Sequence, residues 1–112
     1  VFDRPNKICY AVTGPRTSLQ FLSKICEYLD YKLVSFEAFI DGKAVYHTNV
    51  IMSVAKNYVI LSSFCVEPSS LQRVKERIEL TGKTIIEINL EQTTKFWGIL
   101  SKLLMGTGRA IP

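Results

Sequence analysis

The chain contains a single histidine, His47, and a neutral imidazole is the side chain best suited to act as a general base near pH 7. His47 lies in the segment VYHTNV (residues 45–50), after a predicted turn over Asp41–Lys43 and at the start of a predicted strand. The end of a strand can present a side chain to a cleft, where Thr48 or Asn49 could hold the imidazole tautomer or contact a ligand. The alternative is a surface or half-buried histidine without a role.

A second candidate is Arg16, which stands immediately before the first residues of a predicted helix. A guanidinium beside the positive end of a helix forms an anion site, and its two-pronged geometry matches a carboxylate. Arg16 is therefore a candidate for binding a substrate carboxylate. The alternative is a solvated arginine in a loop.

The cysteines and glutamates are weaker candidates for catalytic residues. Cys65 could be a nucleophile beside His47, but it ends an apolar strand, and we expect a core or loop cysteine there. Glu87 and Glu91 stand near one strand end, and nothing in the sequence fixes either against His47. The three cysteines, which include Cys9 and Cys26, are odd in number and lie far apart, so we expect reduced thiols and no metal site.

Composition narrows the class of protein. The 112 residues are 47% hydrophobic and carry a net charge of +4, as expected for one globular domain. No apolar run approaches the roughly 20 residues of a membrane-spanning helix. The basic stretch Arg73–Arg77 is diluted by Glu76, which indicates a solvated helix face, and we expect no nucleic-acid partner. With no recognisable signal segment, we expect an intracellular, cytoplasmic protein, with an organelle as the alternative.

An internal repeat indicates which elements position these residues. Residues 8–37 align with residues 60–89 without a gap, and five of the 30 positions are identical. In each copy the hydrophobic spacing predicts a strand, a capped helix and a second strand. The predicted strands are 7–12, 33–39, 58–64 and 84–89, and the predicted capping boxes are 17–20 and 69–72.

Each copy is preceded by a candidate leading strand. Residues 49–54 form an apolar run that is joined to Tyr58 by a short polar hairpin, whereas only Val1-Phe2 precede the first copy. We therefore predict an α/β (α+β) fold of two ββαβ modules, about 1–48 and 49–105, in one domain spanning 1–112. A third helix is expected over about 91–104, followed by a tail at 106–112. The position equivalent to Arg16 is Pro68, so the module itself does not require an arginine there.

Four segments in order resemble a known family. They are FDRPNKICYA at 2–11, GPRT at 14–17, YHTNV at 46–50 and TGKTIIEI at 81–88. Together they are similar to the guanidine-modifying superfamily, in the branch of amidinotransferase-like and citrulline- or dimethylarginine-hydrolase proteins. The similarity runs from about Phe2 to Gly98 and implies a five-bladed α/β propeller (pentein-like) of ββαβ modules, here incomplete with two.

The resemblance also implies roles. His47 matches the catalytic histidine, and Arg16 matches the arginine that binds the substrate α-carboxylate. The family's acidic catalytic residues lie upstream of Val1 and its nucleophilic cysteine lies beyond Pro112, while Ile99 replaces a typical asparagine. We therefore expect an arginine-like substrate, no cofactor, inactivity of this chain alone, and partner chains that cover its open edges. The alternative is a non-catalytic structural or interaction subunit within a larger assembly.

Overall fold

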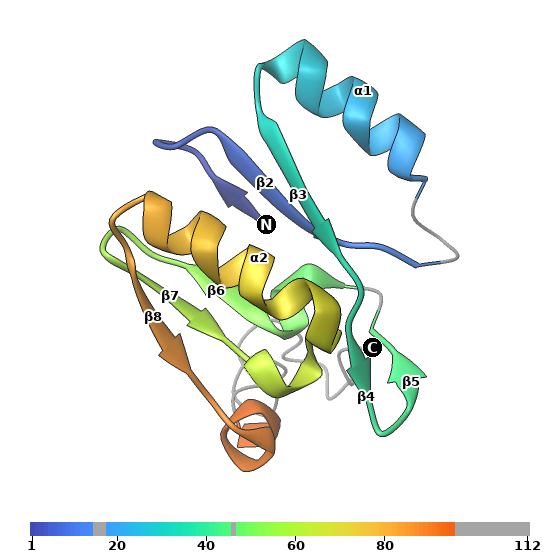
Figure 1. Cartoon of the computed structure of the whole chain (residues 1–112), viewed down its shortest axis with the longest axis vertical. Coiled ribbons are helices and arrows are strands. Elements are labelled where there is room, and N and C mark those ends of the chain that lie inside the picture. Colours follow the sequence, from blue (N-terminus) through green and yellow to red (C-terminus); the bar gives the residue numbers. More distant parts are fainter. Residues whose placement is uncertain (15–17, 46, 96–112) are drawn as a thin grey trace, which may run out of the picture.

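The computed structural model describes residues 1–14, 18–45 and 47–95, and it contains two modules of the same topology (Figure 1). In each module the first strand runs antiparallel to the middle strand, and the last strand runs parallel to it after a helix. The predicted ββαβ order is confirmed. The first module consists of β1 (Phe2–Asp3), β2 (Ile8–Val12), α1 (Leu19–Leu29) and β3 (Lys32–Phe36); the second consists of β6 (Met52–Val54), β7 (Tyr58–Leu61), α2 (Pro68–Leu80) and β8 (Thr84–Glu87).

A linker joins the two modules. It contains the hairpin of β4 (Phe39–Ile40) and β5 (Lys43–Ala44), followed by the short 3₁₀ turn Thr48–Val50. The predicted turn at Asp41–Lys43 is confirmed, because both Asp41 and Gly42 take positive φ angles, of 51° and 75°. The 3₁₀ turn then leads directly into the second module.

Helix α2 forms a layer shared by the two sheets. Figure 1 shows it lying between the sheet of β2 and β3 and the sheet of β6, β7 and β8. Its inward residues Val74 and Ile78 are fully buried, as the helical spacing predicts. The same core cluster includes Ile8, Tyr10, Val12, Val34 and Phe36 from the first sheet and Val59 and Leu61 from the second.

Helix α1 covers the opposite face of the first sheet, where β2 presents its alternate residues Cys9 and Ala11. The apolar residues Leu19, Leu22, Cys26 and Leu29 follow one another at helical spacing, which predicts one buried stripe on α1. The prediction is only partly correct, because Cys26 is buried while Leu19 and Leu29 remain 49% and 47% exposed. The physical reason is that, within the described residues, α1 has a sheet on one side only. Helix α2, by contrast, packs against two.

The helix starts differ from the predicted capping boxes. Helix α1 is capped by Ser18, whose Oγ accepts from the Phe21 N–H at 3.2 Å. Helix α2 begins at Pro68, because proline lacks an N–H and its φ already has a helical value. The Glu67 carboxylate caps this helix by accepting a hydrogen bond from the Ser69 N–H. A reciprocal capping box occurs instead where the helical segment 90–95 begins, since the Asn89 and Gln92 side chains each accept the other's N–H at 2.9 Å.

The strand registers show that the ungapped alignment of residues 8–37 with residues 60–89 is wrong by two residues at the middle strand of each module. Ile8 lies opposite Lys32 in the first sheet, whereas Tyr58, rather than Ile60, lies opposite Thr84 in the second. Strand β7 also ends at Leu61, earlier than predicted, because the chain turns into a 3₁₀ helix at Ser63–Cys65. Helix α2 ends at Leu80, and Gly82, two residues later, has a φ of 82°, a conformation that favours glycine after a helix. The rest of the predicted third helix and the predicted tail 106–112 lie outside the described residues.

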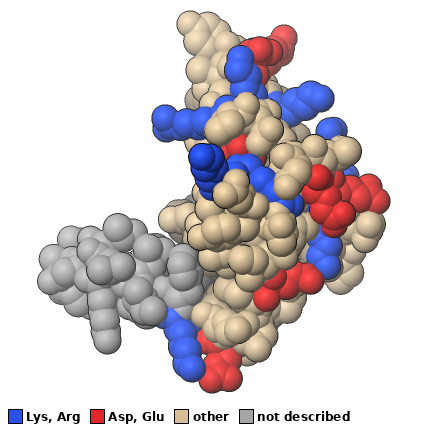
Figure 2. Space-filling view, turned by 90° about the vertical axis from the view of Figure 1, so that its left-hand side faces the viewer, with Lys and Arg blue, Asp and Glu red and all other residues tan. Residues whose placement is uncertain are grey.

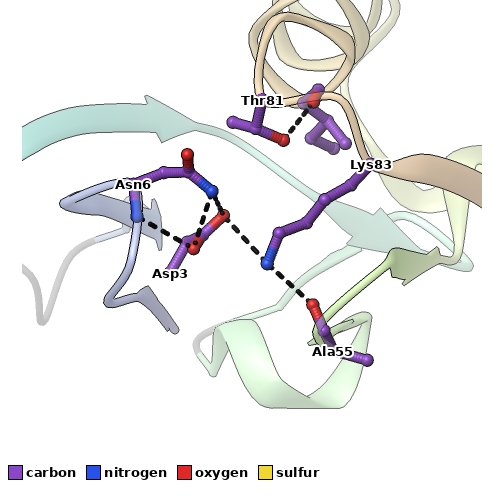
Figure 3. Close-up of polar contacts among 6 residues, drawn as sticks. Asp3, Asn6, Ala55, Thr81 and Lys83 are labelled. Carbon is purple, nitrogen blue, oxygen red and sulfur yellow. Dashed lines mark hydrogen bonds and ion pairs between the residues drawn. The ribbon is translucent and has the colours of Figure 1, made fainter.

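A buried ion pair joins the two modules (Figure 3). Lys83 Nζ, in the loop between α2 and β8, lies 3.3 Å from Asp3 Oδ2 in β1, with the two side chains 7% and 0% exposed. The Asp3 carboxylate also accepts from Asn6 Nδ2 at 3.0 Å, and Lys83 donates to the Ala55 carbonyl at 2.7 Å. These additional hydrogen bonds offset the cost of removing both charges from water.

The charged side chains on one face of the molecule are dispersed. Figure 2 shows Lys and Arg interspersed with Asp and Glu over this face, with no continuous basic patch. In the described part of the chain, no helix is long and apolar enough to cross a membrane.

We predict that Lys83→Met lowers the free energy of unfolding by about 3–5 kcal/mol, because it leaves the Asp3 carboxylate buried without its partner. The matched control is Lys7→Met, which removes an ion pair to Asp30 whose side chains are 60% and 90% exposed, and should cost at most about 1 kcal/mol. Urea unfolding of both variants measures the difference. Equal losses of unfolding free energy in the two variants would contradict the conclusion that Asp3 and Lys83 form a buried ion pair between the modules.

Candidate active site

His47 lies in the linker, immediately before the 3₁₀ turn, and its side chain is exposed. The prediction that it starts a strand is wrong, because β6 begins only at Met52. The backbone turns first: the Val50 N–H donates to the His47 carbonyl and the Ile51 N–H donates to the Thr48 carbonyl, both at 3.1 Å. The turn places His47 at its very beginning, where its extended backbone (φ −122°, ψ 119°) carries the imidazole clear of the core.

A groove of about 430 Å³ lies beside His47. Its walls come from the start of the chain, from strand β2, from helix α1 and from the 3₁₀ turn, and most of its side chains are apolar. The lining residues are Val1, Phe2, Cys9, Tyr10, Ala11, Val12, Leu22, His47, Thr48 and Asn49. The groove combines an apolar floor with one imidazole at its rim, an arrangement able to hold the aliphatic part of a ligand and to exchange a proton with its polar end.

Thr48 connects this turn to the end of strand β2. Its Oγ1 accepts a hydrogen bond from the Val12 N–H at 2.9 Å, across 36 residues of sequence. Sequence reasoning named Thr48 as a candidate to hold the His47 tautomer or to contact a ligand. The structure shows its oxygen engaged with the backbone of β2, a contact that no local pattern indicates, and the expected role stays a prediction.

The second predicted site residue, Arg16, lies outside the described residues. The described chain leads toward it from Thr13, whose N–H donates to the Phe36 carbonyl at 2.8 Å. Strand β2 is thus anchored at its end on both sides, to β3 through Thr13 and to the His47 turn through Val12. The carboxylate-binding role of Arg16 stays a prediction.

The described cysteines are core residues. Cys65 is 2% exposed and packs in the main core, as predicted, and burial raises the pKa of its thiol to about 11. Burial, with a smaller contribution from neighbouring Cys26, likewise raises the pKa of the Cys9 thiol to about 11. Because a thiolate is the nucleophilic form, neither Cys9 nor Cys65 is activated for attack at neutral pH.

The two glutamates considered from the sequence form ion pairs with lysines. Glu87 lies 2.7 Å from Lys75 Nζ, and this contact, together with a hydrogen bond from Ser63, lowers the pKa of the carboxylic acid. Glu91 lies 3.3 Å from Lys95 Nζ on one exposed helix turn. No group of three or more potential metal ligands occurs among the residues that the structure describes.

We predict that Cys9 and Cys65 resist a thiol reagent in the native chain at mildly alkaline pH and react fully after unfolding in urea. Their folded-state pKa values of about 11 exceed the ordinary value of 9.0. Burial of the two protonated thiols therefore makes its full contribution to the stability of the fold below pH 9.0. It is lost as pH rises from 9.0 toward 11, because the unfolded thiols ionise first. Rapid labelling of either residue in the native chain would contradict this.

Comparisons with known proteins agree with the resemblance found in the sequence. The model of the family "N,N dimethylarginine dimethylhydrolase, eukaryotic" matches residues 1–111. A comparison with curated protein sequences found no match.

Two solved structures show the likeness in fold. One is the apo structure of ArgZ, an arginine dihydrolase from the ornithine–ammonia cycle in cyanobacteria, with a TM-score of 0.65 and 21% identity over 87% of this chain and 15% of that one. The other is the product-bound N-terminal domain of ArgZ, with a TM-score of 0.60 and 20% identity over 80% of this chain and 37% of that one. This chain therefore spans only a part of each. Since the family model covers nearly all of its residues, the chain belongs to the eukaryotic N,N-dimethylarginine dimethylhydrolase family, within the guanidine-modifying superfamily.

Proposed function

We propose that this chain supplies part of the active site of a hydrolase that acts at the guanidine carbon of an arginine-like substrate. The observation that carries the proposal is the position of His47, which stands at the rim of an apolar groove in a chain of the dimethylarginine dimethylhydrolase family. The substrate class is taken from the family, the N,N-dimethylarginine dimethylhydrolases, and from ArgZ, an arginine dihydrolase.

In this proposal His47 performs the proton transfers. A cysteine thiolate attacks the guanidine carbon, and the imidazolium of His47 gives its proton to the departing nitrogen. The imidazole then takes a proton from the water that releases the cysteine. Its exposed position before the 3₁₀ turn supports this role, because an imidazole buried in the core could not reach a ligand.

The nucleophile comes from outside the described residues, because Cys9, Cys26 and Cys65 are all buried and the raised pKa values of Cys9 and Cys65 keep those two thiols protonated. We infer that this chain is inactive alone and that residues beyond it, or another chain, complete the site. Arg16 binds the substrate α-carboxylate in this account. Two ββαβ modules then form part of a five-bladed propeller, whose further modules cover the open face of α1 and the outer face of the second sheet.

A second candidate function is a non-catalytic interaction subunit. It is favoured by the exposed apolar side chains of α1, where Phe21 is 64% and Tyr28 is 90% exposed. A surface of this kind is typical of a face that another chain or module covers. Both candidates require further protein against α1, and only the enzyme requires an open groove at His47.

We expect the full-length protein to convert arginine or N,N-dimethylarginine to citrulline, and His47→Ala to lower kcat by about 10²–10⁴-fold through loss of general acid–base catalysis. Citrulline release over time measures the rate. Arg16→Gln should raise KM by about 10–100-fold through loss of a charged hydrogen bond, while Arg4→Gln, in the exposed turn between β1 and β2, serves as its control.

Wild-type rates in both the His47 and the Arg16 variant would contradict the proposed site. A full-length protein that releases no product from either substrate would contradict the enzyme and favour the interaction subunit.

A further inference from the structure

The hydroxyl of Thr48 lies on the edge of β2 that β1 also borders. Along β2, the Tyr10 N–H donates to the Val1 carbonyl at 2.8 Å, and two residues later the Val12 N–H donates to Thr48 Oγ1 at 2.9 Å. Alternate N–H groups of a strand point to the same side, so the Thr48 side chain continues the hydrogen-bonding edge of β2.

The same residue starts the turn that carries the imidazole. Thr48 follows His47 directly, and the backbone bonds Val50 N–H to His47 O and Ile51 N–H to Thr48 O give the turn a fixed shape. Threonine is branched at Cβ, so few rotamers are open to it and its Oγ1 is a rigid attachment point. A movement of the Thr48 hydroxyl is therefore transmitted to His47 across one peptide unit.

The strand at the other end of this bond is itself immobilised. The Val12 side chain is 2% exposed within the main core, and the Thr13 N–H is held by the Phe36 carbonyl at 2.8 Å. The hydrogen bond from Val12 to Thr48 therefore ties an exposed turn to a fixed part of the fold. His47 forms no capping hydrogen bond of its own that could serve this purpose.

We propose that Thr48 is a positioning residue for His47, which it holds at the rim of the groove through the hydrogen bond from the Val12 N–H. The inference rests on the proposed function, because only a histidine that transfers protons needs to be held in one position. Thr48 itself touches no reacting atom in this account. Its effect belongs to the proton transfers and not to the capture of the substrate, for which Arg16 is the candidate.

The test compares three variants of the full-length protein. Thr48→Val keeps the shape of the side chain and removes Oγ1, Thr48→Ser retains the hydroxyl, and Thr84→Val changes an exposed threonine of β8. We expect Thr48→Val to lower kcat about 10–100-fold with KM within threefold, because a small misplacement of a catalytic group is costly. Thr48→Ser should recover most of kcat, and Thr84→Val should leave both constants unchanged.

Hydrogen exchange supplies a readout that does not depend on activity. In Thr48→Val the peptide covering residues 8–14 should show one amide, that of Val12, exchanging at least about tenfold faster, and Thr48→Ser should retain its protection. Unchanged exchange in Thr48→Val would overturn the proposal, since the hydrogen bond would not be needed to protect Val12. Faster exchange with unchanged kcat would overturn the positioning role while leaving the proposed function intact. A wild-type protein without activity would overturn both.

Discussion

The buried ion pair between Asp3 and Lys83 is the interaction on which the arrangement of the two modules depends. It joins the first strand of one module to the loop that precedes the last strand of the other, and both charges are removed from water. Such a pair is tolerated only when its remaining hydrogen-bonding capacity is satisfied, and Asn6 and the Ala55 carbonyl satisfy it here. Beside this pair, α2 serves as a helical layer for both sheets at once, because its buried residues share one core cluster with residues of both.

The linker that carries His47 is held between these two fixed bodies. At its start the Glu37 carbonyl accepts from the Glu67 N–H of the second module, and at its end the Ile51 carbonyl accepts from the Ser62 N–H. The hydrogen bond between Val12 and Thr48 adds a third attachment, in the middle. An exposed turn anchored at several points can present one side chain to a ligand without the loss of order that a free loop would require for binding.

Much of the fold follows from local sequence signals, and the site follows from them only in part. Hydrophobic spacing predicted the order of strands and helices, and the turn predicted over Asp41–Lys43 is present, with positive φ angles at Asp41 and Gly42. The apolar run 49–54 misled the prediction for His47, since its first residues close a 3₁₀ turn before the strand begins. The contacts that place the modules and the His47 turn, Asp3 to Lys83 and Val12 to Thr48, join residues far apart in sequence, and no periodicity encodes them. The half-exposed stripe of α1 depends likewise on which elements surround it.

The most direct test of the account is a crystal structure of the full-length protein with an arginine-like ligand bound. The account predicts the guanidine group within hydrogen-bonding distance of the His47 imidazole, about 2.6–3.2 Å, with the aliphatic chain over the apolar floor formed by β2 and α1. It also predicts that the Val12–Thr48 hydrogen bond is present in the complex. A ligand bound away from this groove, or an imidazole directed away from the guanidine group, would contradict the account.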